Sequence, residues 1–518
     1  MPSARTPTSP SLNDFTQLAR THTLVPVTRT VAADLETPVS AFLRVAAHEP
    51  EAFLLESVEG GETIGRYTFI GIRPFRTMTA AGSSITEATP GSAPVTRTGD
   101  IFAELKSALA GHIPARLSGL PPFTSGAVGF FAYDIVRQIE KLPTLAADEL
   151  HVPDAHLMFF DEVLAFDHVR KAIHLIVTAG ARTPLQSTNP NPQLIDLETR
   201  VRDAYNDAND RLDRLEALLE AALHKPTHEP ISEPLDLTPR TKREDFLQAV
   251  ETTKEYIRAG DVFQCVLSQR FDCTPGVDPF EIYRSLRIVN PSPYMYFLRF
   301  NLPGQGSERR AHIVGSSPEL LVRVHGRNVE YRPIAGTRPR GADEVHDRTL
   351  EADLRADAKE VAEHVMLVDL GRNDLGRVSD YGSVRVKDLM FIERYSHVMH
   401  LVSALEGTLR PELAPIDALR ACFPAGTLSG APKIRAMEII EELEPARRGV
   451  YGGAIIYADF SGNLDSCIAI RTLFMDGERG YIQAGAGIVA DSIPEREDEE
   501  CRNKAAAVVR AIERARSA

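Results

Sequence analysis

Tryptophan is absent from the 518 residues of this chain, and cysteine occurs only five times. The cysteines form no Cys-x-x-Cys pair and no cluster with histidine, which argues against a disulfide framework and a zinc site and fits a reducing cytoplasm. No run of about 18 apolar residues occurs, so the sequence predicts no membrane-spanning helix. Basic residues gather only in pairs and the net charge is −14, so a nucleic acid is not expected as a partner.

What is present is typical of a globular protein, with 43% hydrophobic and 25% charged residues. Residues 1–20 are predicted as a flexible tail, and a Pro-rich linker at 226–242 separates region 21–225 from region 243–518. Strands and helices mix on both sides of the linker without a regular βαβ alternation, which favours a layered α/β or α+β fold. Two segments of undefined role are predicted as surface insertions: 80–98 and 183–193.

Pairs of glutamates carry the first chemical signal. Glu360 and Glu363 lie three residues apart in a helix predicted over 348–370, and Glu497 and Glu500 repeat this spacing in the last helix. Residues three apart share one helix face, so each pair presents its carboxylates in one direction. Two such faces across a cleft would suit Mg²⁺, which prefers oxygen ligands. A solvated acidic surface is the simpler interpretation, and the spacing alone leaves both open.

Glycine-rich segments carry a second signal. Segment 483–488 follows a predicted strand, and it is either a tight turn or a place where backbone N–H groups approach an anion. Segment 334–341 adds two arginines that could hold a carboxylate. Segment 426–433 resembles a nucleotide-binding P-loop only loosely, because Ala-Pro precedes its lysine and no Ser or Thr follows, so a nucleotide site is not predicted.

Single residues add candidates, each with a structural alternative. Glu319 follows Pro318 and precedes two leucines, so its carboxyl could have a raised pKa and act as an acid, or could be a paired surface group. Arg471 lies in the apolar run 467–473, which is predicted as a strand, and its guanidinium requires a bound anion or a carboxylate partner there. His400 follows an apolar stretch, where a histidine is more often a core residue than a catalyst.

Taken in order, these segments resemble the chorismate-utilising enzymes, and among them the anthranilate synthase component I group, from about residue 20 to the end. The resemblance rests on twelve segments: 54–57, 66–71, 260–271, 290–295, 316–319, 333–341, 359–374, 399–403, 426–433, 451–454, 483–491 and 500–504. It implies a fold with two packed β-sheets flanked by helices. It also implies a lyase that converts chorismate and ammonia to anthranilate and pyruvate in tryptophan biosynthesis.

The resemblance further implies roles for individual residues. Glu363 and Glu500 would bind Mg²⁺, with Glu360 and Glu497 nearby. Glu319 would protonate the departing hydroxyl, and His400 would assist the elimination of pyruvate. The remaining active-site residues would be Gln264, Thr427 and Lys433. Chorismate itself would be bound by Gly336, Thr337, Tyr451, Arg471, Gly485, Ala486 and Gly487.

Two positions separate related reactions. Relatives that add water to chorismate carry a lysine where this chain has Gln264, and glutamine cannot act as a base at neutral pH. Relatives that attack chorismate through an enzyme amine carry a lysine where this chain has Ala335. Both residues favour anthranilate as the product, and 4-amino-4-deoxychorismate synthase component I remains the alternative. A non-catalytic tryptophan-binding module is a further alternative of a different class.

Partners and regulation also follow from the resemblance. The sequence lacks a Gly-x-Cys-x-Gly motif with a downstream His-x-Glu, so a separate glutamine amidotransferase subunit is expected to supply ammonia, in a heterotetramer. Region 21–225 would be regulatory and region 243–518 catalytic. L-Tryptophan would act as a feedback inhibitor at a site formed by Glu56, Ser57, Pro293, Tyr294, Met295, Ile455 and Tyr457. From the residues alone, a packed strand and a turn explain these positions equally well.

Overall fold

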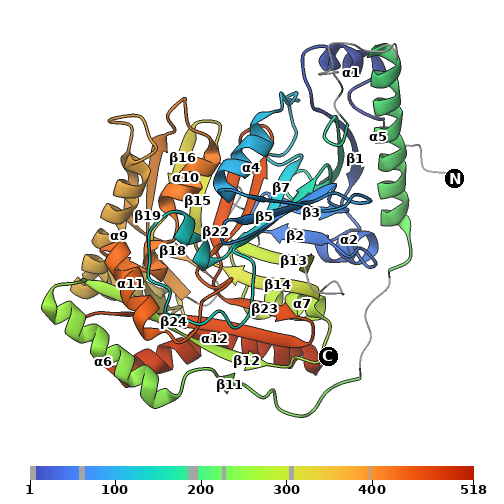
Figure 1. Cartoon of the computed structure of the whole chain (residues 1–518). Coiled ribbons are helices and arrows are strands. Elements are labelled where there is room, and N and C mark those ends of the chain that lie inside the picture. The colour runs from blue at the N-terminus through green and yellow to red at the C-terminus, as the bar shows by residue number, and fades with distance from the viewer. Residues whose placement is uncertain are drawn as a thin grey trace.

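Two antiparallel β-sheets flanked by helices form the fold (Figure 1). The computed structural model describes residues 7–57, 65–183, 185, 197–223, 229–302, 309–395 and 398–517. The first sheet runs in the order β1 (Val25–Ala32), β10 (Ala172–Ala179), β9 (Glu162–Asp167), β3 (Tyr67–Ile72), β2 (Ala52–Glu56), β13 (Tyr294–Leu302), β14 (Arg309–Ser317), β23 (Thr472–Asp476), β24 (Arg479–Ile488), β12 (Gln264–Cys273) and β11 (Thr238–Pro239), and β20 (Gly430–Ala431) also pairs with β12.

The second sheet has a similar extent. Its order is β17 (Ile334–Pro339), β19 (Val398–Thr408), β16 (Asn328–Tyr331), β15 (Leu320–His325), β22 (Leu464–Ile468), β21 (Ala454–Asp459), β7 (Gly126–Phe131), β8 (Ala155–Phe160), β4 (Arg76–Ala81), β5 (Ser84–Ala88) and β6 (Val95–Thr98), and β18 (Arg385–Arg394) also pairs with β19. Strands from before and after the linker share both sheets, since β2 pairs with β13 and β7 with β21. The domain boundaries therefore stay a prediction, because the two regions interleave.

Helices cover the outer faces of the two sheets. They are α1 (Leu12–Ala19), α2 (Pro38–Val45), α4 (Ile101–Ala110), α5 (Leu197–Glu220), α6 (Arg243–Ala259), α7 (Pro279–Val289), α8 (Glu344–Ala356), α9 (Ala358–Gly376), α10 (Pro415–Cys422), α11 (Lys433–Leu443) and α12 (Pro494–Arg516). Of the helices described, none is both long and apolar enough to cross a membrane.

Three hydrophobic clusters define the layers. Side chains of β2, β13 and β14 meet those of β7, β8 and β21 between the two sheets, where Phe53, Phe130 and Phe300 are fully buried. A second cluster joins the outer face of the first sheet to α2, α5, α7 and α12. A third joins the second sheet to α4 and α10. The layers therefore follow the order helix, sheet, sheet and helix, with one hydrophobic cluster between each pair of neighbouring layers.

The chain changes sheets at two points that bear on function. It passes from β14 to β15 through Pro318 and Glu319, and it returns from β22 to β23 through residues 469–471. The prediction of one strand over 467–473 is therefore wrong, because Arg471 adopts a left-handed backbone conformation with φ of 53°. The amide of Ser316 donates to the carbonyl oxygen of Arg471 at 3.2 Å, so the two crossovers lie side by side.

Other local predictions also change. Residues 12–19, expected within a flexible tail, form α1, because Phe15 is fully buried and packs against Tyr205 of α5. The helix predicted over 348–370 is two helices, since Asp357 is extended and its carboxylate caps the start of α9. Segment 483–488 is the end of β24 rather than a turn.

The two predicted insertions have different outcomes. Much of segment 80–98 lies in an antiparallel arrangement of β4, β5 and β6 at the edge of the second sheet, so it extends the sheet. Segment 183–193 falls almost entirely outside the described residues.

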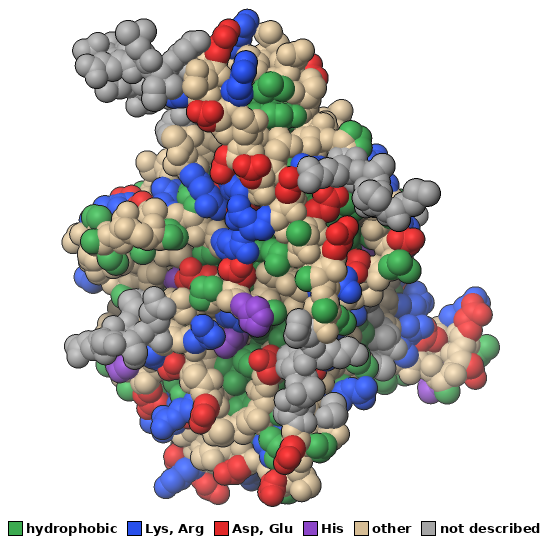
Figure 2. Space-filling model, turned by 90° about the vertical axis from the view of Figure 1, so that its right-hand side faces the viewer, with side chains coloured by type: hydrophobic (Ala, Val, Ile, Leu, Met, Phe, Trp, Pro, Cys, Tyr) green, Lys and Arg blue, Asp and Glu red, His purple; other side chains and the backbone are tan. Residues whose placement is uncertain are grey.

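On the face in Figure 2, acidic and basic side chains are interspersed and hydrophobic ones are scattered, with one local group of basic side chains.

Candidate active site

A cavity of about 700 Å³ opens beside the two crossovers, between the ends of the sheets and helices α9 and α12. Most of the predicted site residues line it: Gln264, Glu319, Gly336, Thr337, Glu360, Glu363, His400, Thr427, Tyr451, Arg471, Gly485, Gly487, Glu497 and Glu500. These residues span more than 230 positions in sequence. Only the tertiary fold brings them to one place.

Glu319 has the properties of a proton donor. Its side chain sits at the crossover between the sheets, and burial raises the pKa of the carboxyl above its ordinary value. The hydroxyl of Thr427 donates a hydrogen bond of 2.8 Å to its Oε2, which partly offsets this rise. A carboxyl held this way keeps its proton closer to neutral pH than an exposed glutamate does, as a general acid requires.

His400 has the properties of a neutral base. It lies on β19 opposite Thr337 of β17, and its Nδ1 is 3.1 Å from the carbonyl oxygen of Gly336. Because a carbonyl oxygen only accepts, we assign the hydrogen to Nδ1, which leaves Nε2 with a free lone pair. Burial lowers the pKa of His400, so the ring is neutral at pH 7. Gly336 allows this geometry, since its φ of 69° disfavours any residue with a side chain.

The glutamate pairs face the same cavity from two helices. Glu360 and Glu363 lie in the first turns of α9, and Glu497 and Glu500 lie near the start of α12. Burial raises the pKa of Glu360 and of Glu497, and the neighbouring carboxylate of each pair adds to the rise. A cation between the helices would relieve this repulsion, so the donor set fits Mg²⁺, which needs only one or two carboxylates.

Protein groups contact the two predicted ligands in the structure. The amide of Gln264 donates to Glu363 at 2.9 Å, and the ammonium of Lys504 lies 2.6 Å from Glu500. Within the described residues, no three His, Cys, Asp or Glu side chains form a ready-made metal cluster. The carboxylates of Glu363 and Glu500 would therefore have to rearrange to share an ion.

The other end of the cavity is suited to a carboxylate. Arg471 makes no ion pair with any described residue, and its guanidinium donates to the carbonyl oxygen of Lys504 at 3.0 Å. The hydroxyl of Tyr451 lies close to Gly485, where an added Cβ would stand 2.7 Å from it. An added Cβ would also stand 2.7 Å from the backbone oxygen of Leu267, so a glycine at 485 lets both Tyr451 and β12 approach the strand closely.

Lys504 is a cavity residue that the sequence did not single out. Its ammonium contacts both Glu500 and the carbonyl oxygen of Gly485, at 2.6 and 2.9 Å, and so bridges the predicted metal and substrate ends. The available signal was its position four residues after Glu500 in the same helix, which places both side chains on one face.

Two predicted residues do not line the cavity. Lys433 binds Asp374 at 2.8 Å and the carbonyl oxygen of Cys422 at 3.4 Å, both away from the cavity. Its ammonium therefore compensates a buried carboxylate, and a role for Lys433 in the active site stays a prediction. Ala486 is fully buried in a hydrophobic cluster with Leu267 and Ala436, because its side chain points to the opposite face of β24 from Gly485 and Gly487.

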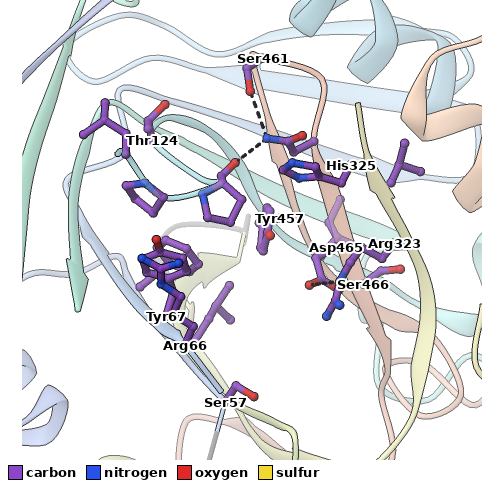
Figure 3. Close-up of a pocket in the computed structure, with 18 of the residues that line it drawn as sticks. Ser57, Arg66, Tyr67, Thr124, Arg323, His325, Tyr457, Ser461, Asp465 and Ser466 are labelled. Atoms are coloured by element: carbon purple, nitrogen blue, oxygen red, sulfur yellow. Dashed lines mark hydrogen bonds and ion pairs between the residues drawn. The ribbon is translucent and has the colours of Figure 1, made fainter. Parts of the chain in front are cut away.

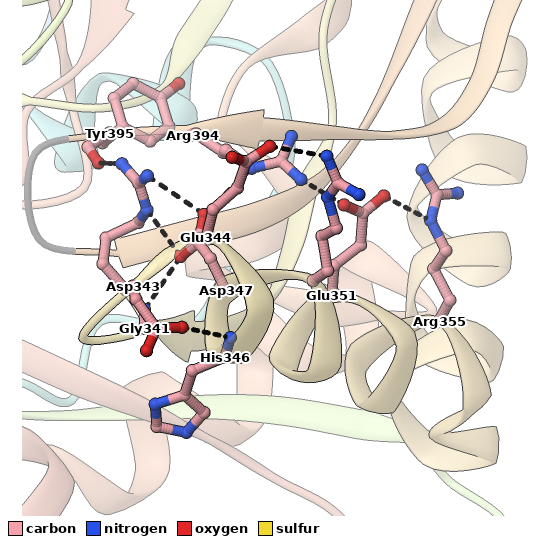
Figure 4. A network of polar contacts seen from close by, with 11 residues as sticks. Gly341, Asp343, Glu344, His346, Asp347, Glu351, Arg355, Arg394 and Tyr395 are labelled. Atoms are coloured by element: carbon pink, nitrogen blue, oxygen red, sulfur yellow. Dashed lines mark hydrogen bonds and ion pairs between the residues drawn. The ribbon is translucent and has the colours of Figure 1, made fainter.

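An ionic network anchors α8 beside the cavity (Figure 4). Asp347 accepts hydrogen bonds from Arg340 at 2.9 Å and from Arg394 at 3.2 Å, and these keep its pKa well below the ordinary value. Glu351 pairs with Arg394 and with Arg355. The network links α8 to the ends of β17 and β18, and so supports the strand that carries Gly336 and Thr337.

A second cavity, of about 900 Å³, contains every residue predicted to bind tryptophan (Figure 3). Tyr457 lies within it and packs against Phe69 and Phe123, with ring centroids 5.7 and 5.0 Å apart. Met295 and Ile455 are almost fully buried in its wall. An aromatic wall of this kind can hold a flat apolar ligand.

Glu56, which is predicted to bind tryptophan, has its carboxylate bound by other protein side chains. The carboxylate of Glu56 is bound by the hydroxyl of Tyr283 at 2.5 Å and by the guanidinium of Arg287 at 2.9 Å. Across the cavity, Arg323 pairs with Asp465 at 2.9 Å and donates to the hydroxyl of Tyr294 at 3.0 Å. No local pattern indicates this pair, because Arg323 and Asp465 lie on different strands, 142 positions apart.

Comparison with known proteins agrees with this geometry. A family model described as chorismate binding enzyme matches residues 50–510. The chain therefore belongs to the family of chorismate-binding enzymes. Anthranilate synthase component 1 from Acetivibrio thermocellus is 47% identical over 513 residues, which cover 98% of this chain and 99% of that protein. The protein of the same name from Mycobacterium tuberculosis is 48% identical over 507 residues, 97% of this chain and 95% of that protein.

Solved structures confirm the predicted fold. Anthranilate synthase component I from Streptococcus pneumoniae matches with a TM-score of 0.72 and 36% identity, covering 92% of this chain and 99% of that one. The menaquinone-specific isochorismate synthase from Escherichia coli matches with a TM-score of 0.67 and 17% identity, covering 97% and 98%. The second likeness shows the fold alone. Both the predicted family and the two layered sheets are thus confirmed.

Proposed function

We propose that this chain is component 1 of an anthranilate synthase, which converts chorismate and ammonia to anthranilate and pyruvate. The observation that supports this most is one cavity that gathers a buried acid, a neutral histidine, two carboxylate pairs and an arginine that forms no ion pair with the described residues. Relatives named anthranilate synthase component 1 cover nearly the whole chain at 47–48% identity.

The residues divide the chemistry between them. Arg471 and Tyr451 bind the carboxylate of the enolpyruvyl group and orient the ring. Glu319 donates its proton to the departing 4-hydroxyl, which leaves as water when ammonia adds to the ring. His400 then takes the ring proton at Nε2, and the bond between the ring and the enolpyruvyl oxygen breaks to leave the aromatic product. The departing enolate takes up one proton at its methylene carbon and becomes pyruvate, so the proton removed from the ring is balanced.

Glu363 and Glu500, with Glu360 and Glu497 nearby, would hold Mg²⁺. Bound there, Mg²⁺ would withdraw charge from the ring carboxylate and ease loss of the hydroxyl. The raised pKa values of Glu360 and Glu497 support a cation between the helices.

Two cavity residues favour anthranilate over the products of related reactions, Ala335 against attack through an enzyme amine and Gln264 against addition of water. Ala335 lies in the wall of the cavity, so no side-chain amine stands there to attack chorismate. Gln264 lies beside Glu363, and its amide cannot take a proton from water. Ammonia, already a nucleophile, needs no base at this position.

Ammonia would come from a glutamine amidotransferase subunit, and L-tryptophan would inhibit by binding the 900 Å³ cavity. Asp465 and Ser466 of β22 line this cavity, and Arg471 after the same strand lines the other, so the two cavities share one short segment. Inhibition requires that tryptophan favour a state with a poorer active site.

Anthranilate fluorescence tests the proposal. The purified chain should form anthranilate from chorismate, Mg²⁺ and ammonium, but not from glutamine until the partner subunit is added. Added L-tryptophan should reduce the rate. A non-fluorescent aminodeoxychorismate product would favour the alternative, and no product under any condition would refute both.

A further inference from the structure

A buried guanidinium lies behind the cavity, at a position that no motif singled out. Arg448 is only 3% exposed and follows α11. Its Nε and one terminal nitrogen bind the carboxylate of Glu444 at 2.8 and 2.6 Å. The other bonds go to backbone carbonyl oxygens, that of Leu428 at 2.6 Å and that of Val266 at 2.7 Å.

Glu444 extends the same contact to the first sheet. Its Oε1 accepts from both the amide and the hydroxyl of Ser268, each at 2.8 Å. The carboxylate is 7% exposed. Although burial disfavours the guanidinium charge, Glu444 holds the pKa of Arg448 above its ordinary value. The guanidinium of Arg448 therefore stays charged, and all three of its nitrogens donate hydrogen bonds.

The partners of Arg448 belong to three walls of the cavity. Leu428 and Val266 both line it, one residue after Thr427 and two residues after Gln264. The guanidinium also lies over the ring of Tyr451, 5.7 Å from its centroid, and over that of Tyr133, which is not a lining residue of the cavity, at 4.7 Å. The amide of Val266 in turn donates to the carbonyl oxygen of Ser429 at 2.9 Å, so the loop and β12 are held together from both sides.

A buried ion pair is a costly way to stabilise a fold, because apolar residues of similar volume often serve as well or better. The planar fork of arginine, however, can bond several acceptors in fixed directions, which neither an apolar side chain nor lysine can do. Arg448 uses this fork on the groups beside Thr427, Gln264 and Tyr451, which favours a positioning role over simple stabilisation.

We propose that Arg448, supported by Glu444, is a positioning residue that sets the relative placement of the Thr427 loop, the Gln264 strand and Tyr451. It touches neither chorismate nor ammonia and acts through these three neighbours. The inference rests on the proposed function, since it concerns the rate of the same reaction.

Arg448→Lys tests the proposal, because it keeps the charge beside Glu444 and removes the fork. Arg447→Lys is the matched control: Arg447 is the adjacent residue, and its carboxylate contacts, Asp134 at 3.9 Å and Asp148 at 3.5 Å, lie outside the cavity. Thermal unfolding of each variant should remain cooperative. With ammonium as substrate, kcat should fall about tenfold in Arg448→Lys and less than twofold in the control.

A double-mutant cycle separates positioning from stabilisation. In a Thr427→Ala background, Arg448→Lys should cost only about threefold, because part of its effect runs through Thr427. Effects of the two substitutions on kcat that simply multiply would overturn the proposal, and so would a folded Arg448→Lys enzyme with kcat within twofold of wild type.

If Arg448→Lys does not fold, Glu444→Gln replaces it in the same test, because glutamine keeps an acceptor oxygen for Ser268. An inactive wild type overturns the proposed function together with this inference, whereas an active wild type with an unaffected variant overturns the inference alone.

Discussion

Replacing Glu319 by glutamine removes the proton that the proposed reaction needs while leaving the size of the side chain unchanged. The amide oxygen of glutamine can still accept the 2.8 Å hydrogen bond from Thr427, so the crossover between the sheets should keep its structure. General acid catalysis contributes about 10²–10⁴-fold to a rate. The Glu319→Gln enzyme should therefore lose about 3–5 kcal/mol of transition-state stabilisation, at about 1.4 kcal/mol per tenfold change.

Thr427→Ala provides the scale for comparison. It deletes one hydrogen bond to the carboxyl, which contributes about 0.5–1.5 kcal/mol, so kcat should fall by only about two- to tenfold. The hydrogen bond favours the carboxylate, so its loss raises the pKa of Glu319 further. A general acid is lost as pH rises through its pKa, and the alkaline limb of kcat should therefore move to higher pH in Thr427→Ala. Thr427→Ser, which keeps the hydroxyl, should resemble the wild type.

Initial rates of anthranilate fluorescence measure both effects, with saturating chorismate and a constant concentration of free ammonia across the pH series. Circular dichroism and thermal unfolding establish that each variant is folded. A Glu319→Gln enzyme within tenfold of wild type would refute the assignment of the acid. An alkaline limb that moved to lower pH in Thr427→Ala would refute the account of its pKa.

Three further outcomes are expected. Glu363→Gln and Glu500→Gln should each weaken Mg²⁺ binding, measured by calorimetry, by at least tenfold, and unchanged affinity in both would contradict the metal assignment. Tyr457→Ala should raise the tryptophan concentration for half-inhibition about three- to tenfold without changing kcat, because an aromatic pair contributes about 0.5–1.5 kcal/mol. Since the chain has no tryptophan, fluorescence of the bound ligand reports this affinity directly. Gly485→Ala should raise the KM for chorismate about tenfold or more, because its Cβ would stand 2.7 Å from the Tyr451 hydroxyl and from the backbone oxygen of Leu267 and would displace Tyr451, and an unchanged KM in a folded variant would contradict the role of Tyr451 in binding.

Much of the local structure follows from short-range pattern in the sequence. Helix α6 ends at Gly260, which adopts the left-handed conformation with φ of 86°, as is typical of a glycine directly after a helix. The i, i+3 glutamates do share a helix face in both α9 and α12. These features depend on residues within one or two helical turns, so the sequence carries them directly.

Local pattern failed where distant contacts decide conformation. The run 467–473 looks like one strand, yet the packing of two sheets forces a crossover at Arg471. Segment 483–488 looks like a turn because it is rich in glycine, yet pairing with β12 keeps it extended. In both cases tertiary pairing overrides the local preference.

The order of residues sets which chemical groups are available and, through resemblance, indicates the family. Which of these groups meet depends on how the two sheets and their helices pack. This packing placed the Lys433 ammonium on Asp374, away from the cavity, and the Arg448 guanidinium behind three of the cavity walls. The physical reason is that a buried charge must find its partner wherever the packed core leaves one, and that partner can lie anywhere along the chain.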